Sequence, residues 1–191
     1  MISDKPAPAT QTSERLITGE ELAKMPGGEL SELIEGRIVP MSPTSHIHGR
    51  VETRIANRLS IFAEAGKLGQ VMTGEVGIYI RRSPDTIRAA DVIFISNARY
   101  AQSQSQSYLD VAPELVVEVL SPDDAWQVVM RKLADYFSIG VQVVWIADPE
   151  TRSVDAYRSV TAAQQFNEGD TLTAPEVLPG FTVPVADLFA E

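Results

Sequence analysis

A glutamate within an apolar run is the first residue of this sequence whose position suggests chemistry. Glu118 lies in the run Leu-Val-Val-Glu-Val-Leu, which spans residues 115–120. Burying a carboxylate is costly unless the group is paired or binds a cation. Val116 and Leu120 would share its face of a strand, and both are apolar. This pattern disfavours the structural alternative, an edge strand whose glutamate faces water, and favours a functional role for Glu118.

A second carboxylate begins the preceding strand-like run, Asp-Val-Ile-Phe-Ile at residues 91–95. Aspartate is also common at exposed strand ends, so Asp91 alone is ambiguous. Together with Glu118 it places two carboxylates on neighbouring predicted strands. Mg²⁺ is usually held by one or two carboxylates together with water and substrate phosphate. The pair therefore predicts a site for a hard divalent cation, Mg²⁺ or alternatively Mn²⁺.

Lys132 could complete such a site from the helix that follows the Glu118 strand. It lies beside Leu133, at the margin of the apolar stripe that must pack on the sheet. An ordinary solvated lysine is the structural alternative. In the functional interpretation, the ammonium reaches back to the two carboxylates, stabilises negative charge on a reacting phosphate and helps to position a water.

The elements that must hold these residues form a mixed α/β pattern. Apolar residues at three- and four-residue steps predict a long helix from Ser45 to about Ala65, and a second from residues 122–124 to about Ile139. A short helix at 18–25 carries a capping box, Thr18 with Glu21. Predicted strands are 32–39 (two strands turning at Gly36), 70–73, 75–82, 91–95, 115–120, 141–147 and an edge strand at 154–157, with a last helix at 185–190. A helical crossover between the 115–120 and 141–147 strands predicts that these two are parallel.

Composition limits the function classes. The chain has 191 residues, which suits one domain at 16–191 after a flexible tail at 1–15, and its net charge is −10. Having no cysteine, it has no disulfide, zinc–thiolate site or cysteine nucleophile. We expect no membrane span and no secretory signal, and hence a cytoplasmic protein. The acidic balance argues against a broad nucleic-acid-wrapping surface, which needs Lys and Arg. The polar run at 101–107 predicts a solvated loop.

Several segments together resemble a known family. They are residues 32–36, 41–43, 88–92, 113–122 and 145–149, with His48, Lys132 and Tyr136 between them. In order and spacing they resemble the Uma-two family of restriction-endonuclease-like bacterial proteins, within the PD-(D/E)XK nuclease superfamily. The resemblance covers about residues 16–188. It implies a restriction-endonuclease-like αβββαβ core with a mixed central sheet and extra small strands.

The resemblance also implies an activity, Mg²⁺-dependent hydrolysis of DNA phosphodiester bonds. Asp91 and Glu118 match the acidic residues of the motif and would be the metal ligands. The motif's lysine would fall at Leu120, but the family resemblance places it on the next helix, at Lys132. Glu32 matches an early family glutamate and would be an auxiliary ligand of metal or water. His48 also matches a recurrent position, to which the resemblance assigns no role. The residue pattern alone predicts that Glu32 and Glu35, both in the first hairpin, are solvated.

Two interpretations of function follow. In the first, the chain is a metal-dependent endonuclease acting on DNA, with Asp91, Glu118, Lys132 and Glu32 as candidate catalytic residues. In the second, it is a catalytically inactive member of the fold that acts as a dimeric or partner-binding module, which the net negative charge favours. Hydrolysis of another phosphate ester is a third, weaker alternative. A homodimer is expected because cutting two strands needs two sites or sequential nicking, and two-fold dimers are the commonest oligomers.

Overall fold

A mixed sheet dominates the computed structural model, which describes residues 15–191. The tail predicted at residues 1–15 therefore lies outside the described residues, except for Arg15. In the described part, eight strands pair in the order β2-β1-β4-β5-β6-β7-β8, with β3 pairing to β4. The strands are β1 (Ser31–Ile34), β2 (Arg37–Pro40), β3 (Gly69–Arg81), β4 (Thr86–Ser96), β5 (Leu115–Val119), β6 (Val143–Asp148), β7 (Ser153–Ser159) and β8 (Ala162–Phe166).

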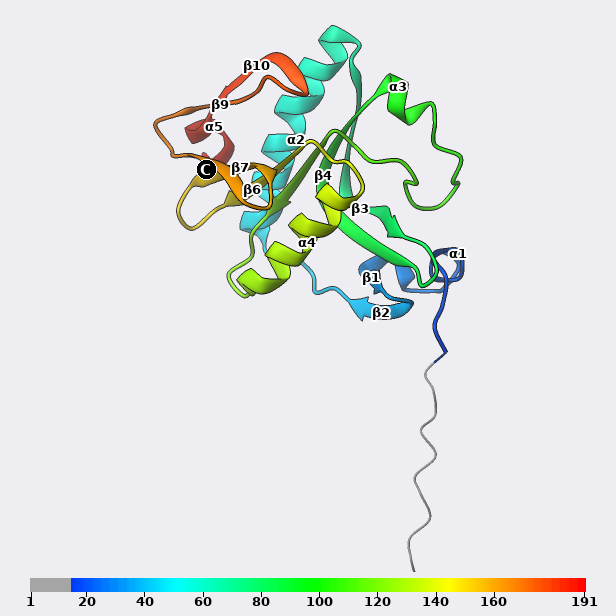
Figure 1. Cartoon of the computed structure of the whole chain (residues 1–191). Helices are drawn as coiled ribbons and strands as arrows, with labels where there is room; N and C mark the ends of the chain where they lie inside the picture. The colour runs from blue at the N-terminus through cyan, green and yellow to red at the C-terminus, as the bar shows by residue number, and fades with distance from the viewer. Residues whose placement is uncertain (1–14) are drawn as a thin grey trace, which may run out of the picture.

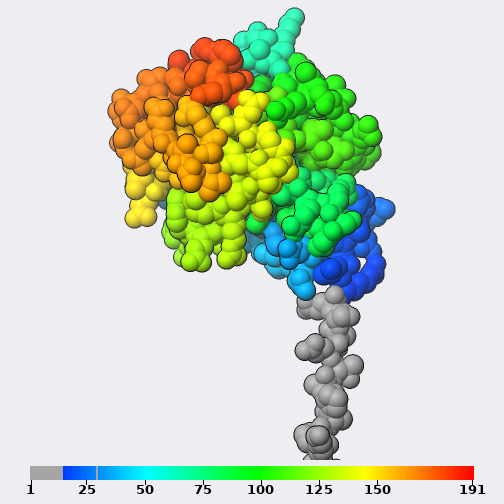
Figure 2. Space-filling model, in the orientation of Figure 1, coloured from blue at the N-terminus to red at the C-terminus, as the bar shows by residue number. Residues whose placement is uncertain are grey.

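Helices cover both faces of this sheet. Figure 1 shows α4 in front of it and α2 behind it. A second, two-stranded sheet follows in the chain, and its strands pair antiparallel. The remaining elements are α1 (Gly19–Leu22), a 3-10 turn (Gly28–Leu30), α2 (His46–Gly66), α3 (Asn97–Tyr100), α4 (Trp126–Ser138), β9 (Thr171–Ala174), β10 (Leu178–Pro184) and α5 (Val185–Phe189). In the same view, Figure 2 shows the N-terminal hairpin and the C-terminal segment at opposite sides of the visible face.

The sheet separates the two larger apolar clusters of the core. Val51, Ile55 and Leu59 of α2 pack in one cluster with Val117 and Trp145. In the other cluster, Leu133 and Tyr136 of α4 pack with Val116 and Ile146. Alternate residues of β5 and β6 therefore point to opposite helices, as strand geometry requires. The parallel pairing of β5 with β6, predicted from the helical crossover, is confirmed.

The predicted α2–β3–β4–β5–α4–β6 succession, which is the αβββαβ core, is confirmed. Ser45 is the N-cap of α2, and its hydroxyl accepts the His48 N–H. Thr18 and Glu21 form the predicted capping box of α1. This core brings the middle of β4, the end of β5, and one face of α4 together.

Several local predictions were wrong. The runs 70–73 and 75–82 form one strand, β3, interrupted by a bulge, because Thr73 pairs with Val92 but Val76 pairs with Ala90. The predicted edge strand, β7, is internal because β8 pairs with its outer side.

The start of α4 also differs from its prediction. The helix begins at Trp126, with Ala125 as N-cap, and Asp124 accepts the Ser121 N–H in a preceding turn. Trp126 is apolar but 50% exposed, and the apolar stripe that packs on the sheet begins at Val129. None of the helices in residues 15–191 is both long and apolar enough to span a membrane.

Candidate active site

The two candidate metal ligands lie on adjacent strands. Val92 of β4 pairs with Val117 of β5 in antiparallel register, so Asp91 and Glu118 occupy the next position of the ladder. Asp91 lies inside β4 and not at a strand start, because β4 begins at Thr86. Its Oδ2 accepts the backbone N–H of Val119 at 2.6 Å. Both carboxylates are buried, as the sequence predicted for Glu118.

Glu118 is held by two side chains of α4. The Lys132 Nζ donates to its Oε2 at 2.6 Å, and the Tyr136 hydroxyl donates to its Oε1 at 2.5 Å. Burial raises the pKa of Glu118 to about 7, and the nearby Asp91 carboxylate adds to that rise against the opposing effect of Lys132. Lys132 and Tyr136 are four residues apart, so they share one helix face and reach the same carboxylate.

Lys132 connects three parts of the site. Besides Glu118, its Nζ donates to the Ala89 carbonyl at 2.9 Å and lies 3.6 Å from Glu32 Oε1. Burial alone would lower the pKa of the ammonium, but the carboxylates of Glu118 and Glu32 outweigh it and raise that pKa. Lys132 is therefore a cation, and the interpretation of it as an ordinary solvated lysine was wrong.

Glu32, on the hairpin strand β1 next to Lys132, is buried, so the expectation from the residue pattern that it is solvated was wrong. Its Oε2 accepts from Arg88 at 2.7 Å, and its Oε1 accepts the Ala89 N–H at 3.1 Å. Arg88 also donates from Nε to Asp135 of α4 at 2.7 Å. The Arg88 side chain thus connects β1, β4 and α4. Glu35, expected to be solvated, has an exposed side chain that pairs with Arg81.

His48, in the first turn of α2, contacts the other candidate ligand. Its Nε2 lies 3.2 Å from Asp91 Oδ2, and its Nδ1 lies 4.0 Å from Glu52 Oε2. Burial opposes the charged imidazolium, but the hydrogen bond and charge of Asp91 outweigh it and raise the pKa of His48. The residue that the sequence could not assign therefore lies against Asp91.

The bulge in β3 adds a residue that the sequence interpretation missed. Gly74 and Glu75 are the two residues between the paired positions of β3, directly across from Asp91. Both have positive φ, 89° and 53°. Burial raises the pKa of Glu75, and the charges of Asp91 and Glu52 raise it further. Bulges are frequent beside active sites, where they redirect a side chain.

The donor chemistry fits a hard divalent cation. Among residues 15–191 no group of three or more His, Asp or Glu side chains is arranged to hold a metal. Mg²⁺ does not need such a cage, because one or two carboxylates suffice when water and substrate phosphate complete its shell. Burial and, to a lesser extent, the charge of Asp91 raise the pKa of Glu118, and a cation beside both carboxylates would relieve the repulsion between them. Asp91 and Glu118 would be the protein ligands.

A small cavity lies beside Glu118. It measures about 50 Å³ and is lined by Glu118, Leu120, Asp124, Val128 and Lys132, among others. Its size suits a few water molecules. The residues that line it come from the end of β5, the following turn and the first half of α4.

The comparisons with known proteins agree with this fold. The Uma2 family, described as "Putative restriction endonuclease", matches residues 19–186. Among solved structures, the chain is similar to "a putative nuclease belonging to DUF820" from Anabaena variabilis ATCC 29413. That match has a TM-score of 0.75 and 21% sequence identity, and it covers 91% of this chain and 97% of the other. Among curated proteins, no sequence matches significantly. Because the family match spans most of its length, this chain belongs to the Uma2 family.

Proposed function

We propose that this protein is a metal-dependent endonuclease that hydrolyses DNA phosphodiester bonds. The observation that carries the proposal is the contact of Lys132 with Glu118, on the strand next to Asp91. A buried ammonium beside two carboxylates could hold a metal ion and stabilise the negative charge that develops during phosphodiester hydrolysis. Membership of the Uma2 family, described as "Putative restriction endonuclease", supports the same class of reaction.

Asp91 and Glu118 would hold Mg²⁺, or Mn²⁺ in its place. When bound, such an ion lowers the pKa of a coordinated water and neutralises charge on the phosphate oxygens. The carboxylates contribute negative charge in fixed positions, because Asp91 is anchored to the Val119 N–H and Glu118 to Tyr136. A site organised in advance avoids reorganisation during the reaction.

Lys132 would act as a cation and not as a base. Its pKa is raised, so it holds its proton at Nζ. The ammonium would donate to a phosphate oxygen or to the attacking water, and so stabilise the negative charge that develops on phosphorus oxygens. With only 18% of its side chain exposed, its charge is screened less by water than a surface lysine's would be.

Three further residues would be positioning residues. Tyr136 orients Glu118 through Oε1, and Glu32 holds Lys132 and Arg88. His48 lies against Asp91 from α2. Their effect on the reaction would pass through the carboxylates and the ammonium that they contact.

Net charge limits how the enzyme would meet its substrate. With a charge of −10, the protein repels the phosphate backbone at long range, which predicts slow and salt-sensitive encounter with DNA. At the site itself a bound divalent cation would reverse the sign of the local charge.

We also propose a homodimer, because two joined sites would cut both strands in one encounter. Light scattering on the purified chain would measure its mass.

Plasmid nicking tests the proposed activity. Supercoiled DNA would be incubated with wild type and with Glu118→Gln, in Mg²⁺, in Mn²⁺ and in EDTA. Glu150→Gln is the matched control, because Glu150 is an exposed carboxylate in the turn after β6. We expect nicking by wild type and Glu150→Gln with metal only, and loss of nicking in Glu118→Gln. Equal nicking by wild type and Glu118→Gln would mean a contaminant or a different site.

A further inference from the structure

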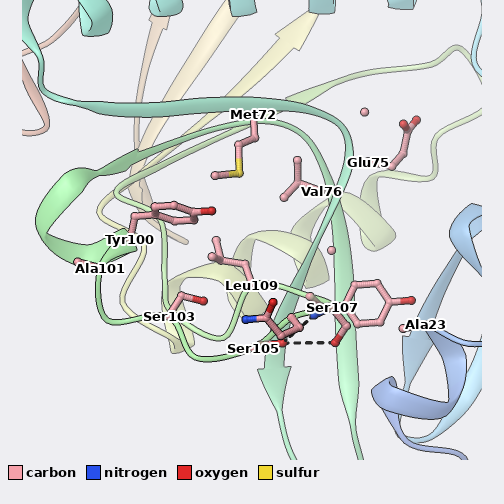
Figure 3. Close-up of a pocket in the computed structure, with 14 residues that line it drawn as sticks. Ala23, Met72, Glu75, Val76, Tyr100, Ala101, Ser103, Ser105, Ser107 and Leu109 are labelled. Carbon is pink, nitrogen blue, oxygen red and sulfur yellow. Dashed lines mark hydrogen bonds between the residues drawn. The ribbon is translucent and has the colours of Figure 1, made fainter.

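A second cavity lies beside the proposed site, between β3 and the segment that follows α3. Its volume is about 870 Å³, within the range of small-molecule pockets. Figure 3 shows the side chains of Met72, Tyr100 and Leu109 pointing into it. Tyr100, the last residue of α3, is 45% exposed, so a ligand can reach its aromatic ring.

The opposite wall is polar and well organised. It is formed by the loop predicted to be merely solvated, and includes Ser103, Ser105 and Gln106. The carboxylate of Asp110 accepts from the Ser103 hydroxyl at 2.6 Å and from the backbone N–H groups of Gln104 and Ser105 at 3.2 and 3.1 Å. This set of bonds fixes the loop and leaves several hydroxyl and amide groups along the cavity wall.

The chemistry of the lining selects among ligands. No lysine or arginine is among the described residues that line this cavity. Phosphate recognition depends on such cations, so the cavity is poorly suited to the sugar–phosphate backbone. An aromatic ring with neighbouring hydroxyls and an amide suits a heterocyclic base instead. The aromatic ring stacks on the face of the base, and the polar groups hydrogen-bond to the edge of the base.

The cavity also adjoins the acidic site. Glu75, from the bulge opposite Asp91, lines its rim, and in Figure 3 its side chain extends away from the Ser105 loop. Because this bulge pairs across from Asp91, a base in the cavity would lie on the β3 side of a phosphodiester held at Asp91 and Glu118.

We propose that this cavity binds one unpaired nucleobase of the strand that is cleaved. The substrate class is then single-stranded or locally unpaired DNA, because a paired base cannot enter a pocket without leaving the helical stack. The inference rests on the proposed nuclease function. It also accounts for how an acidic protein could bind DNA, since stacking supplies affinity that needs no positive surface.

Fluorescence anisotropy would test the inference without requiring cleavage. The probe is a fluorescein-labelled oligonucleotide, used as a single strand and as a blunt duplex of the same sequence, with Ca²⁺ replacing Mg²⁺. The variants are Tyr100→Ala, Tyr100→Phe and Gln106→Ala. Gln164→Ala, on the exposed strand β8, is the control.

We expect wild type to bind the single strand more tightly than the duplex. Tyr100→Ala should bind the single strand about tenfold more weakly, while Tyr100→Phe and the control match wild type. The slope of log affinity against log salt should not change in Tyr100→Ala, because no phosphate contact is removed. Gln106→Ala should alter the preference among homopolymer strands. Because Tyr100 and Gln106 are exposed, the variants should melt at the wild-type temperature.

The outcomes separate this inference from the function on which it rests. Metal-dependent nicking by wild type, with unchanged single-strand binding in Tyr100→Ala, would overturn the base-binding inference alone. Tighter binding of the duplex would overturn it as well. Tyr100-dependent single-strand binding without any nicking in Mg²⁺ or Mn²⁺ would support the base site and overturn the proposed hydrolysis.

Discussion

The Nζ of Lys132 lies 2.6 Å from Oε2 of Glu118, although one residue is on α4 and the other on β5. Both side chains are largely buried, at 18% and 11% exposure. Removing one partner from a buried ion pair leaves the other charge without compensation, which costs far more than an exposed pair is worth. The Lys132–Glu118 pair is therefore expected to affect both the stability of the fold and the proposed hydrolysis.

Lys132→Met should affect both properties. We expect nicking to fall by about 100-fold or more, because one donor to the developing charge is lost. The free energy of unfolding should fall by about 3–5 kcal/mol, because Glu118 is left buried without its cation. Urea denaturation measures this loss. The double variant Lys132→Met with Glu118→Gln should recover part of the stability and none of the activity, whereas no recovery would mean that the methionine itself is poorly packed.

Arg88→Met tests the ion pairs that Arg88 makes with Glu32 and Asp135, next to Lys132. Arg88 is buried between Glu32 and Asp135, so its loss leaves Asp135 without its cation and Glu32 with only Lys132, at 3.6 Å. We expect destabilisation of about 3 kcal/mol in urea denaturation. Arg88→Lys should not restore stability, since an ammonium cannot reproduce the two directed guanidinium bonds. Full stability in either variant would show that the connection between β1 and α4 is held by packing alone.

Gly77→Ala tests the wall between β3 and the base-binding cavity. A Cβ at Gly77 would lie 2.1 Å from Cδ1 of Tyr108, so the ring or the strand must move. Overpacking of this kind costs about 1–3 kcal/mol. Gly49→Ala, in the first turn of α2, meets nothing within 4 Å and should stabilise by about 0.5–1 kcal/mol. In thermal or urea unfolding, the change in the free energy of unfolding should have opposite signs in the two variants. An unchanged free energy of unfolding in Gly77→Ala would contradict the close contact.

Acid should weaken the docking of α1. A hydrogen bond from Arg82 lowers the pKa of Glu20 from 4.5 to about 2. Because the folded-state pKa lies below the unfolded value, the stabilisation is present above pH 4.5 and is lost as pH falls toward 2. The pair is exposed, so the effect is under about 1 kcal/mol. The stability difference between wild type and Glu20→Gln should shrink over this range, and a constant difference would contradict the pairing.

Much of the fold could be predicted from the sequence because its signals are local. The periodic apolar residues of α2, the Ser45 cap and the run around Glu118 each determine an element from neighbouring residues alone. The exposed position of Trp126 and the internal place of β7 could not be read in this way. Both depend on which distant strand or helix covers the segment, and the apolar pattern of β7 suits an edge or an interior strand equally.

The candidate site, too, could be predicted only in part from the sequence. Burial of Glu118 followed from its apolar neighbours, and Lys132 was a candidate from its place on the following helix. The family resemblance added Glu32, and the structure places Lys132 and Glu32 together around Ala89. Glu75 was missed, although Gly74 inside a strand pattern was a signal for a bulge. The four-residue spacing of Lys132 and Tyr136 was a signal that both reach one carboxylate. The Asp91–His48 contact had no local signal, because it joins β4 to the start of α2.

Titration calorimetry of the metal-free protein with Mn²⁺ tests most directly whether Asp91 and Glu118 hold the cation. Wild type, Asp91→Asn, Glu118→Gln and the control Glu150→Gln would be compared, each with its unfolding free energy measured without metal. We predict saturable Mn²⁺ binding by wild type and the control, and binding weakened at least about tenfold in each site variant. No binding by wild type, with both site variants more stable than wild type, would contradict the account and favour the catalytically inactive module.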